Sequence, residues 1–84
     1  MTMFYLHLFN RLGAVLDEEG RDLPDLAAAR EEAIRNARSI MAEEVRAGEL
    51  DLNARIDIAG PRADQVHFTL PFSDALVIRM ASEQ

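Results

Sequence analysis

The longest helix signature in this chain runs from Pro24 to Gly48 and lies between two pairs of short alternating segments. Its apolar residues recur at spacings of three and four, which places them on one stripe of a helix. The stripe consists of Leu26, Ala29, Ala33, Ala37, Ile40 and Met41. We expect a helix from about Asp25 to Ala47, capped by Asp22 or Asp25 and ended by Gly48. Small alanines in its first half allow close packing on a sheet.

Four segments alternate apolar and polar side chains with the period of two that is typical of strands. They are Met3–Phe9, Ala14–Asp17, Ala54–Ala59 and Gln65–Leu70. Asn10–Gly13 and Gly60–Asp64 carry the glycine, proline and asparagine expected of turns. The pattern predicts an α+β fold of ββαββ order, a small antiparallel sheet with one long helix packed on one face. A chain of 84 residues forms one core, so we expect a single domain over residues 1–84.

The expected helix is about 34 Å long, whereas a six-residue strand covers only about 20 Å. Something beyond the sheet must therefore cover the far end of the helix. Leu50 and Leu52 are the candidates within the chain, and a second copy is the candidate outside it. Near the C-terminus, Leu76–Met80 is too short to classify and is expected as an edge strand or a docking segment.

The charge of the chain argues against two classes of partner. Fifteen acidic residues against nine basic ones give a net charge of −6, and a chain of that sign is repelled by nucleic-acid phosphates and by anionic membranes. No stretch has the roughly 20 apolar residues of a membrane-spanning helix, and the N-terminus lacks a signal-peptide pattern. The absence of cysteine does not by itself fix the compartment, but for the two preceding reasons the chain is expected in the cytoplasm.

The motifs of common catalytic and cofactor sites are missing from the sequence. There is no glycine-rich phosphate loop, no nucleophile elbow and no histidine pair at metalloprotease spacing. We therefore assign no catalytic residue, expect no cofactor, and favour a protein that is not an enzyme. An active site in this chain would have to rely on histidines and carboxylates.

The alternation of the strands divides their side chains between two faces of the sheet. The face toward the helix should hold Phe4, Leu6, Leu8, Ile56, Ile58, Val66, Phe68 and Leu70. The opposite face should hold Tyr5, His7, Phe9, Arg55, Asp57, His67 and Thr69. If the first and last strands are neighbours, His7 and His67 lie within about 5 to 8 Å of each other, with Asp57 nearby. Such a group could share a metal ion or a ligand.

Two functions are consistent with the sequence: the first because the first strand is apolar on both faces and the helix is longer than the sheet, and the second because of the polar residues on the opposite face. In the favoured interpretation the protein is a non-catalytic interaction module that forms homo-oligomers, with a basic protein as another possible partner. The expected interface residues are Tyr5, Phe9, Met41 and Val45. In the alternative, the face binds a small ligand or a metal of unknown identity. The expected ligand-binding residues are Tyr5, His7, Arg55, Asp57 and His67.

Several short sequences, in this order, resemble those of one small family. They are Tyr5-Leu6-His7, Asp17-Glu18-Glu19-Gly20, Leu23-Pro24-Asp25-Leu26 with Ala28-Ala29-Arg30, Leu50-Asp51-Leu52, and Pro71-Phe72. The chain is similar over nearly its whole length to an uncharacterised family of stand-alone domains of unknown function, found largely in alphaproteobacteria such as rhizobia and their relatives. The resemblance implies a fold and a provenance. It carries over no catalytic residue.

Overall fold

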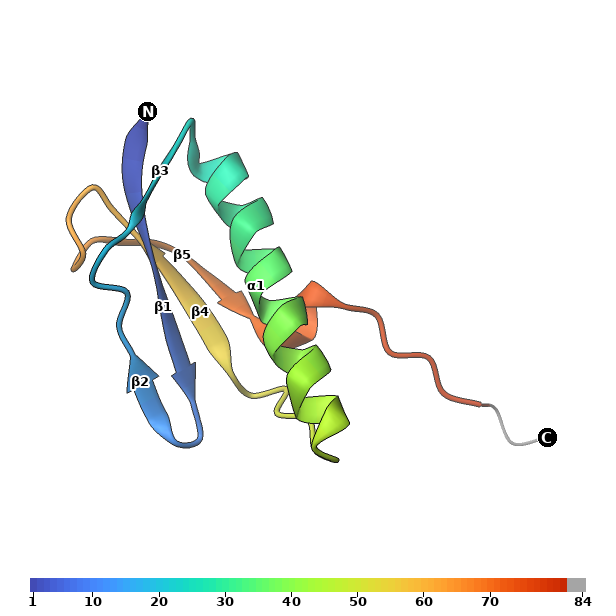
Figure 1. The fold of residues 1–84 in the computed structure, drawn as a ribbon. Coiled ribbons are helices and arrows are strands. Elements are labelled where there is room, and N and C mark those ends of the chain that lie inside the picture. Colours follow the sequence, from blue (N-terminus) through green and yellow to red (C-terminus); the bar gives the residue numbers. More distant parts are fainter. Residues whose placement is uncertain (82–84) are drawn as a thin grey trace.

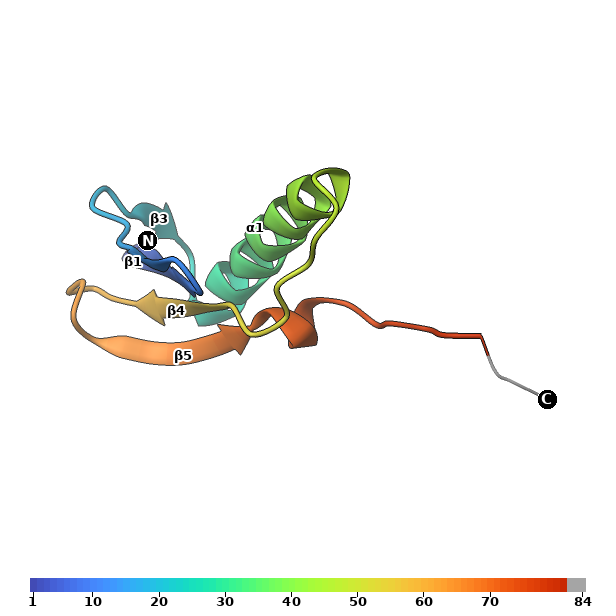
Figure 2. The same ribbon diagram turned by 90° about the horizontal axis from the view of Figure 1, so that it is seen from below.

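The computed structural model describes residues 1–81 and has the predicted α+β architecture, an antiparallel sheet with one long helix in ββαββ order (Figure 1). The elements are β1 (Thr2–Asn10), β2 (Gly13–Val15), β3 (Arg21–Leu23), α1 (Leu26–Arg46), β4 (Arg55–Ala59), β5 (Val66–Pro71) and the 3₁₀ helix η1 (Phe72–Ala75). Figure 2 shows α1 lying across one face of the sheet. The predicted fold class is confirmed.

The sheet has the strand order β2-β1-β4-β5, and every pairing is antiparallel. The short strand β3 pairs with the first residues of β1, whereas β2 pairs with its last residues. We predicted one strand over Ala14–Asp17 and did not predict β3. The difference arises at Asp17–Gly20, where a turn leads the chain away from the middle of β1 and returns it as a second short strand.

Helix α1 begins and ends at the predicted signals. The Asp25 carboxylate accepts a hydrogen bond from the Ala28 N–H at 2.9 Å, so Asp25 is the N-cap. After the C-cap Ala47, Gly48 adopts a φ of 92°, the left-handed conformation that commonly ends a helix. The buried side of the helix consists of Ala29, Ala33, Ala37 and Met41, and the small alanines allow the helix to lie close to the strands.

The core lies between α1 and the sheet and extends to η1. Its larger members are Phe4, Leu6, Met41, Ile56, Ile58, Leu70 and Phe72. The Phe72 N–H donates to the Ala54 carbonyl at 2.9 Å, which fixes η1 against the start of β4. At the far end of the helix, Leu52 packs against the core, while Leu50 and Val45 stay exposed. The chain itself therefore covers only part of the end of the helix.

One residue, Val66, does not lie on the helix-facing side of the sheet, where we predicted it. A register shift makes Ile58 pair with Phe68 and Ala59 pair with Val66, so His67 has no direct partner on β4. This bulge reverses the alternation at the start of β5. Val66 is consequently 52% exposed instead of facing the helix, and that prediction was wrong. The other seven predicted residues lie in the core or pack against it.

The chain leaves the domain after η1. Leu76 still packs against the core, but residues 77–81 have no regular secondary structure and extend away from the domain (Figures 1 and 2). Leu76–Met80 is thus not an edge strand. Within residues 1–81, none of the helices combines the length and the apolar character required to cross a membrane.

Candidate functional site

His7 is held by backbone groups at both of its ring nitrogens. The Asp17 N–H donates to Nδ1 at 3.0 Å, and Nε2 lies 2.8 Å from the Ala63 carbonyl oxygen. A carbonyl only accepts, so the ring proton is on Nε2 and Nδ1 is the acceptor. The side chain is buried, with 6% exposure. This arrangement joins three segments, β1 and the two loops that contain Asp17 and Ala63, and leaves neither nitrogen open to a metal.

The Asp17 carboxylate accepts a β1 backbone hydrogen bond that a neighbouring strand would otherwise accept. Its Oδ2 accepts from the Leu6 N–H at 3.1 Å, and its Oδ1 accepts from the N–H groups of Glu19 and Gly20 at 3.2 and 3.0 Å. Burial raises the pKa of this carboxyl, but the three backbone donors, with Gly20 the strongest, and the charge of Arg21 outweigh burial and hold the pKa below its ordinary value. The turn Asp17–Gly20 therefore has a structural role, because it holds this part of the chain against the middle of β1.

Asp57 is the centre of a second polar group on the face opposite the helix. Its Oδ1 accepts from Arg55 Nε at 3.2 Å and from Thr69 Oγ1 at 2.9 Å. The Arg55 guanidinium also lies over the Phe9 ring, 4.2 Å from its centre. Asp57 is the direct cross-strand partner of His7, as the alternation predicted. Since its partners are side chains of the same sheet, Asp57 serves the structure.

His67 is separated from this group. Strand β4 lies between β1 and β5, so His7 and His67 are not on adjacent strands and the condition for a shared metal ion is not met. His67 sits in the bulge of β5, is exposed, and its Nε2 contacts the Gly60 carbonyl oxygen. Among residues 1–81, no three His, Asp or Glu side chains are arranged to hold a metal ion.

Tyr5 and His7 border a hollow of about 550 Å³ on the face opposite the helix. Their rings are stacked, with centres 6.3 Å apart and an angle of 16° between the planes. The remaining residues of the hollow are Leu16, Asp17, Glu18, Ala63 and Asp64. The predicted ligand site is thus divided, because Tyr5 and His7 line the hollow whereas Arg55, Asp57 and His67 do not.

The predicted interface residues also have different surroundings. Met41 is 2% exposed and belongs to the core, so it is inaccessible to a second chain, and its inclusion was wrong. Val45 is exposed on the last turns of α1, and Tyr5 and Phe9 are half-buried. The helical stripe placed Met41 and Val45 near each other, but sequence spacing alone did not show that the core reaches Met41 and stops before Val45.

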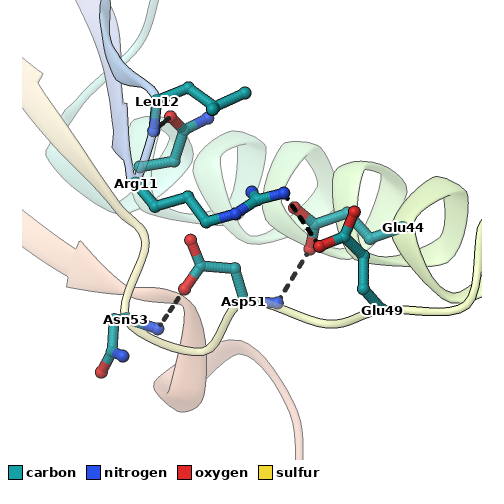
Figure 3. Close-up of polar contacts among 7 residues, drawn as sticks. Arg11, Leu12, Glu44, Glu49, Asp51 and Asn53 are labelled. Carbon is teal, nitrogen blue, oxygen red and sulfur yellow. Dashed lines mark hydrogen bonds and ion pairs between the residues drawn. The ribbon is translucent and has the colours of Figure 1, made fainter.

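A third polar group, which we did not predict, joins the end of α1 to the β1–β2 turn (Figure 3). Arg11 forms an ion pair with Glu49 at 2.9 Å. Glu44 accepts from the Asp51 N–H at 3.1 Å, and Asp51 Oδ1 accepts from the Asn53 N–H at 2.9 Å. These contacts order the loop between α1 and β4. The Arg11–Glu49 pair joins residues 38 positions apart, and no local pattern indicated it.

The fold and these contacts define a small α+β domain whose polar side chains mainly connect its own loops and strands. The chain belongs to the family described as Domain of unknown function (DUF6894), whose model matches residues 3–73. The resemblance to a family of unknown function is thereby confirmed. No curated protein matches the chain, and no solved structure matches it.

Proposed function

We propose that this protein is a non-catalytic interaction module that associates with further copies of itself in the cytoplasm of a bacterium. The alphaproteobacterial origin implied by the resemblance is part of the same proposal. The supporting observation is the segment after η1, in which Val77, Ile78 and Met80 are 75%, 53% and 86% exposed. Apolar side chains gathered in one exposed segment favour a protein contact.

The position of the exposed segment in the chain supports this proposal. The family match ends at residue 73, and residues 77–81 extend away from the domain a few positions later (Figure 1). The polar groups that could have served catalysis, His7, Asp17 and Asp57, are bonded to other parts of the domain. A basic protein remains another possible partner, because the net charge of −6 attracts one.

The experiment is the solution mass by light scattering over a dilution series. We expect a mass of at least two chains that falls toward one chain on dilution. A single-chain mass at every concentration would overturn the proposal. A mass that rises only when a basic protein is added would assign the contact to that partner instead.

The hollow beside Tyr5 supports a second candidate function, the binding of a small ligand. Its volume of about 550 Å³ is in the range of ligand pockets, and Glu18 and Asp64 at its border favour a cation. Tyramine, an aromatic amine, is a suitable NMR probe because its ring can stack on Tyr5. We expect the NMR signals of Tyr5 and His7 to shift, and we expect Tyr5→Ala to abolish the shift of the His7 signals. Unchanged spectra with tyramine would exclude this candidate.

A further inference from the structure

Arg79 differs from the other arginines of the chain, because no side chain or carbonyl of residues 1–81 pairs with it. Of the nine basic residues, all arginines, six form ion pairs with carboxylates of the domain. Two more contact an aromatic ring or a backbone carbonyl. Arg79 lies instead between Ile78 and Met80 in the exposed segment after η1. This segment therefore presents apolar side chains together with a positive charge that the described part of the chain does not neutralise.

The hollow beside Tyr5 has the complementary character. Its walls include Tyr5 and Leu16, and Leu16 is 58% exposed. At its border, Asp17 is bonded to backbone N–H groups, and Asp64 lies 3.5 Å from an arginine of its own loop. Glu18 is exposed and forms no ion pair within residues 1–81. The hollow thus combines apolar walls with a carboxylate whose charge is not neutralised.

Two other hollows of the domain lack this combination. The groove of about 250 Å³ between α1 and β1 contains Arg21, which forms an ion pair with Glu32. The hollow of about 400 Å³ at the end of α1 contains Glu49, which pairs with Arg11. Among these three hollows of residues 1–81, the one beside Tyr5 therefore offers the unpaired negative charge.

We infer that Arg79 of one copy enters the hollow of a second copy and pairs there with Glu18. The inference deepens the proposed self-association and rests on it. The guanidinium then also lies near the Tyr5 ring, whose face attracts a cation. Alternate side chains of an extended segment share one side, so Val77 enters beside Arg79 and covers Leu16. The same contact in both directions gives a dimer with two identical halves.

The segment of the same chain cannot reach this hollow. The hollow includes Ala63 and Asp64, which precede the start of β5, whereas the segment follows η1 at the other end of that strand. Leu76 packs against the core, and the three residues from Leu76 to Arg79 span at most about 11 Å. Strand β5 alone is about 20 Å long, and the segment extends away from the sheet (Figures 1 and 2). A second copy has no such restriction.

Charge reversal tests the pair. We expect Glu18→Arg and Arg79→Glu each to raise the dissociation constant of self-association, measured by light scattering, at least tenfold, because repulsion replaces attraction in both halves of the contact. The variant with both substitutions keeps the net charge of the unsubstituted chain and restores an opposite pair, so its dissociation constant should return to within threefold of the original. The matched control is Glu19→Arg, at the next exposed position of the same turn, which should change the constant less than threefold. Circular dichroism checks the fold of each variant.

Crosslinking locates the contact, because the chain contains no cysteine. Two full-length variants, Leu16→Cys and Val77→Cys, are mixed and oxidised, so that a disulfide between positions 16 and 77 joins different chains. Disulfides require Cα atoms about 4.4 to 6.8 Å apart. The control replaces Leu16→Cys with Ser39→Cys, an exposed position on α1. We expect the mixed disulfide, identified by mass spectrometry, in at least tenfold excess over the control.

The outcomes separate this contact from self-association itself. If the unsubstituted chain associates but the single reversals match Glu19→Arg, the contact of Arg79 with the hollow is overturned and the proposed self-association stands. The same conclusion follows if the double variant stays as weak as the single ones, or if the crosslink forms equally with Ser39→Cys. If the unsubstituted chain is a monomer throughout, both are overturned.

Discussion

Asp17 and His7 are joined by a hydrogen bond of 3.0 Å from the Asp17 backbone to the His7 ring, while the Asp17 side chain accepts from the N–H of Leu6, the residue before His7. The bonds run in opposite directions between the same two segments. They close the gap along β1 where neither β2 nor β3 pairs with it. Two residues with the chemistry of an active site are thus used to complete the sheet.

Asp17→Asn should destabilise the fold by about 1 to 3 kcal/mol at pH 7, because an amide cannot accept at both ends as the carboxylate does. The folded pKa of Asp17 is lowered, so its contribution to stability is present above about pH 4 and is lost as the pH falls through that lower value. Urea unfolding at pH 7 and pH 3 measures the effect. Glu18→Gln in the same turn is the control. An equal loss of stability in both variants would contradict the structural role of the Asp17 carboxylate.

His7→Ala should cost about 2 to 3 kcal/mol, because it leaves the Asp17 N–H and the Ala63 carbonyl without their partner inside the fold. His67→Ala should cost less than about 1 kcal/mol, since His67 is exposed. Denaturant unfolding compares the two. In nitrogen NMR spectra, His7 should show the proton on Nε2 and should not respond to zinc. A zinc-dependent change at His7 would contradict the arrangement.

Asp25→Ala should destabilise the protein by about 1 kcal/mol, the usual effect of losing a helix N-cap. The control is Asp22→Ala, three residues earlier in β3 and exposed, which should change stability by less than about 0.5 kcal/mol. Thermal unfolding monitored by circular dichroism distinguishes the two variants. Equal effects would show that the carboxylate of Asp25 does not act through the Ala28 N–H.

The patterns that repeat along the chain were sufficient to predict the helix, two candidates for its cap, its terminating glycine and most of the core. They could not predict the bulge at His67, because the register depends on how β4 and β5 pair and not on either strand alone. Strand order also depends on how the strands pair. In the structure, β4 lies between the strands that contain His7 and His67. Alternation did predict that His7 and Asp57 share a face, and they are direct neighbours.

The bonds of His7 show a second limit of prediction from sequence. Both of its partners are backbone groups of distant loops, Asp17 N–H and Ala63 C=O. Backbone groups have no sequence signature, so a buried structural histidine and a histidine that binds a ligand look alike in the sequence. The sequence Asp17-Glu18-Glu19-Gly20 was noted as part of the family resemblance, and the contact of Asp17 with Leu6 became visible only in the folded chain.

Gly60→Ala should destabilise the domain by about 4 kcal/mol or more, because Gly60 has a φ of 151° and an added Cβ would collide with the Met3 carbonyl oxygen in β1. Backbone atoms of a central strand cannot move aside as a flexible side chain can. Gly13→Ala is the matched control, since Gly13 has a φ of 129° but open space around its Cα. Gly13→Ala adds only the conformational strain, which should lower the free energy of unfolding by about 1 to 3 kcal/mol. Denaturant unfolding of both variants separates the collision from the strain, and equal losses would contradict the close approach of Gly60 to β1.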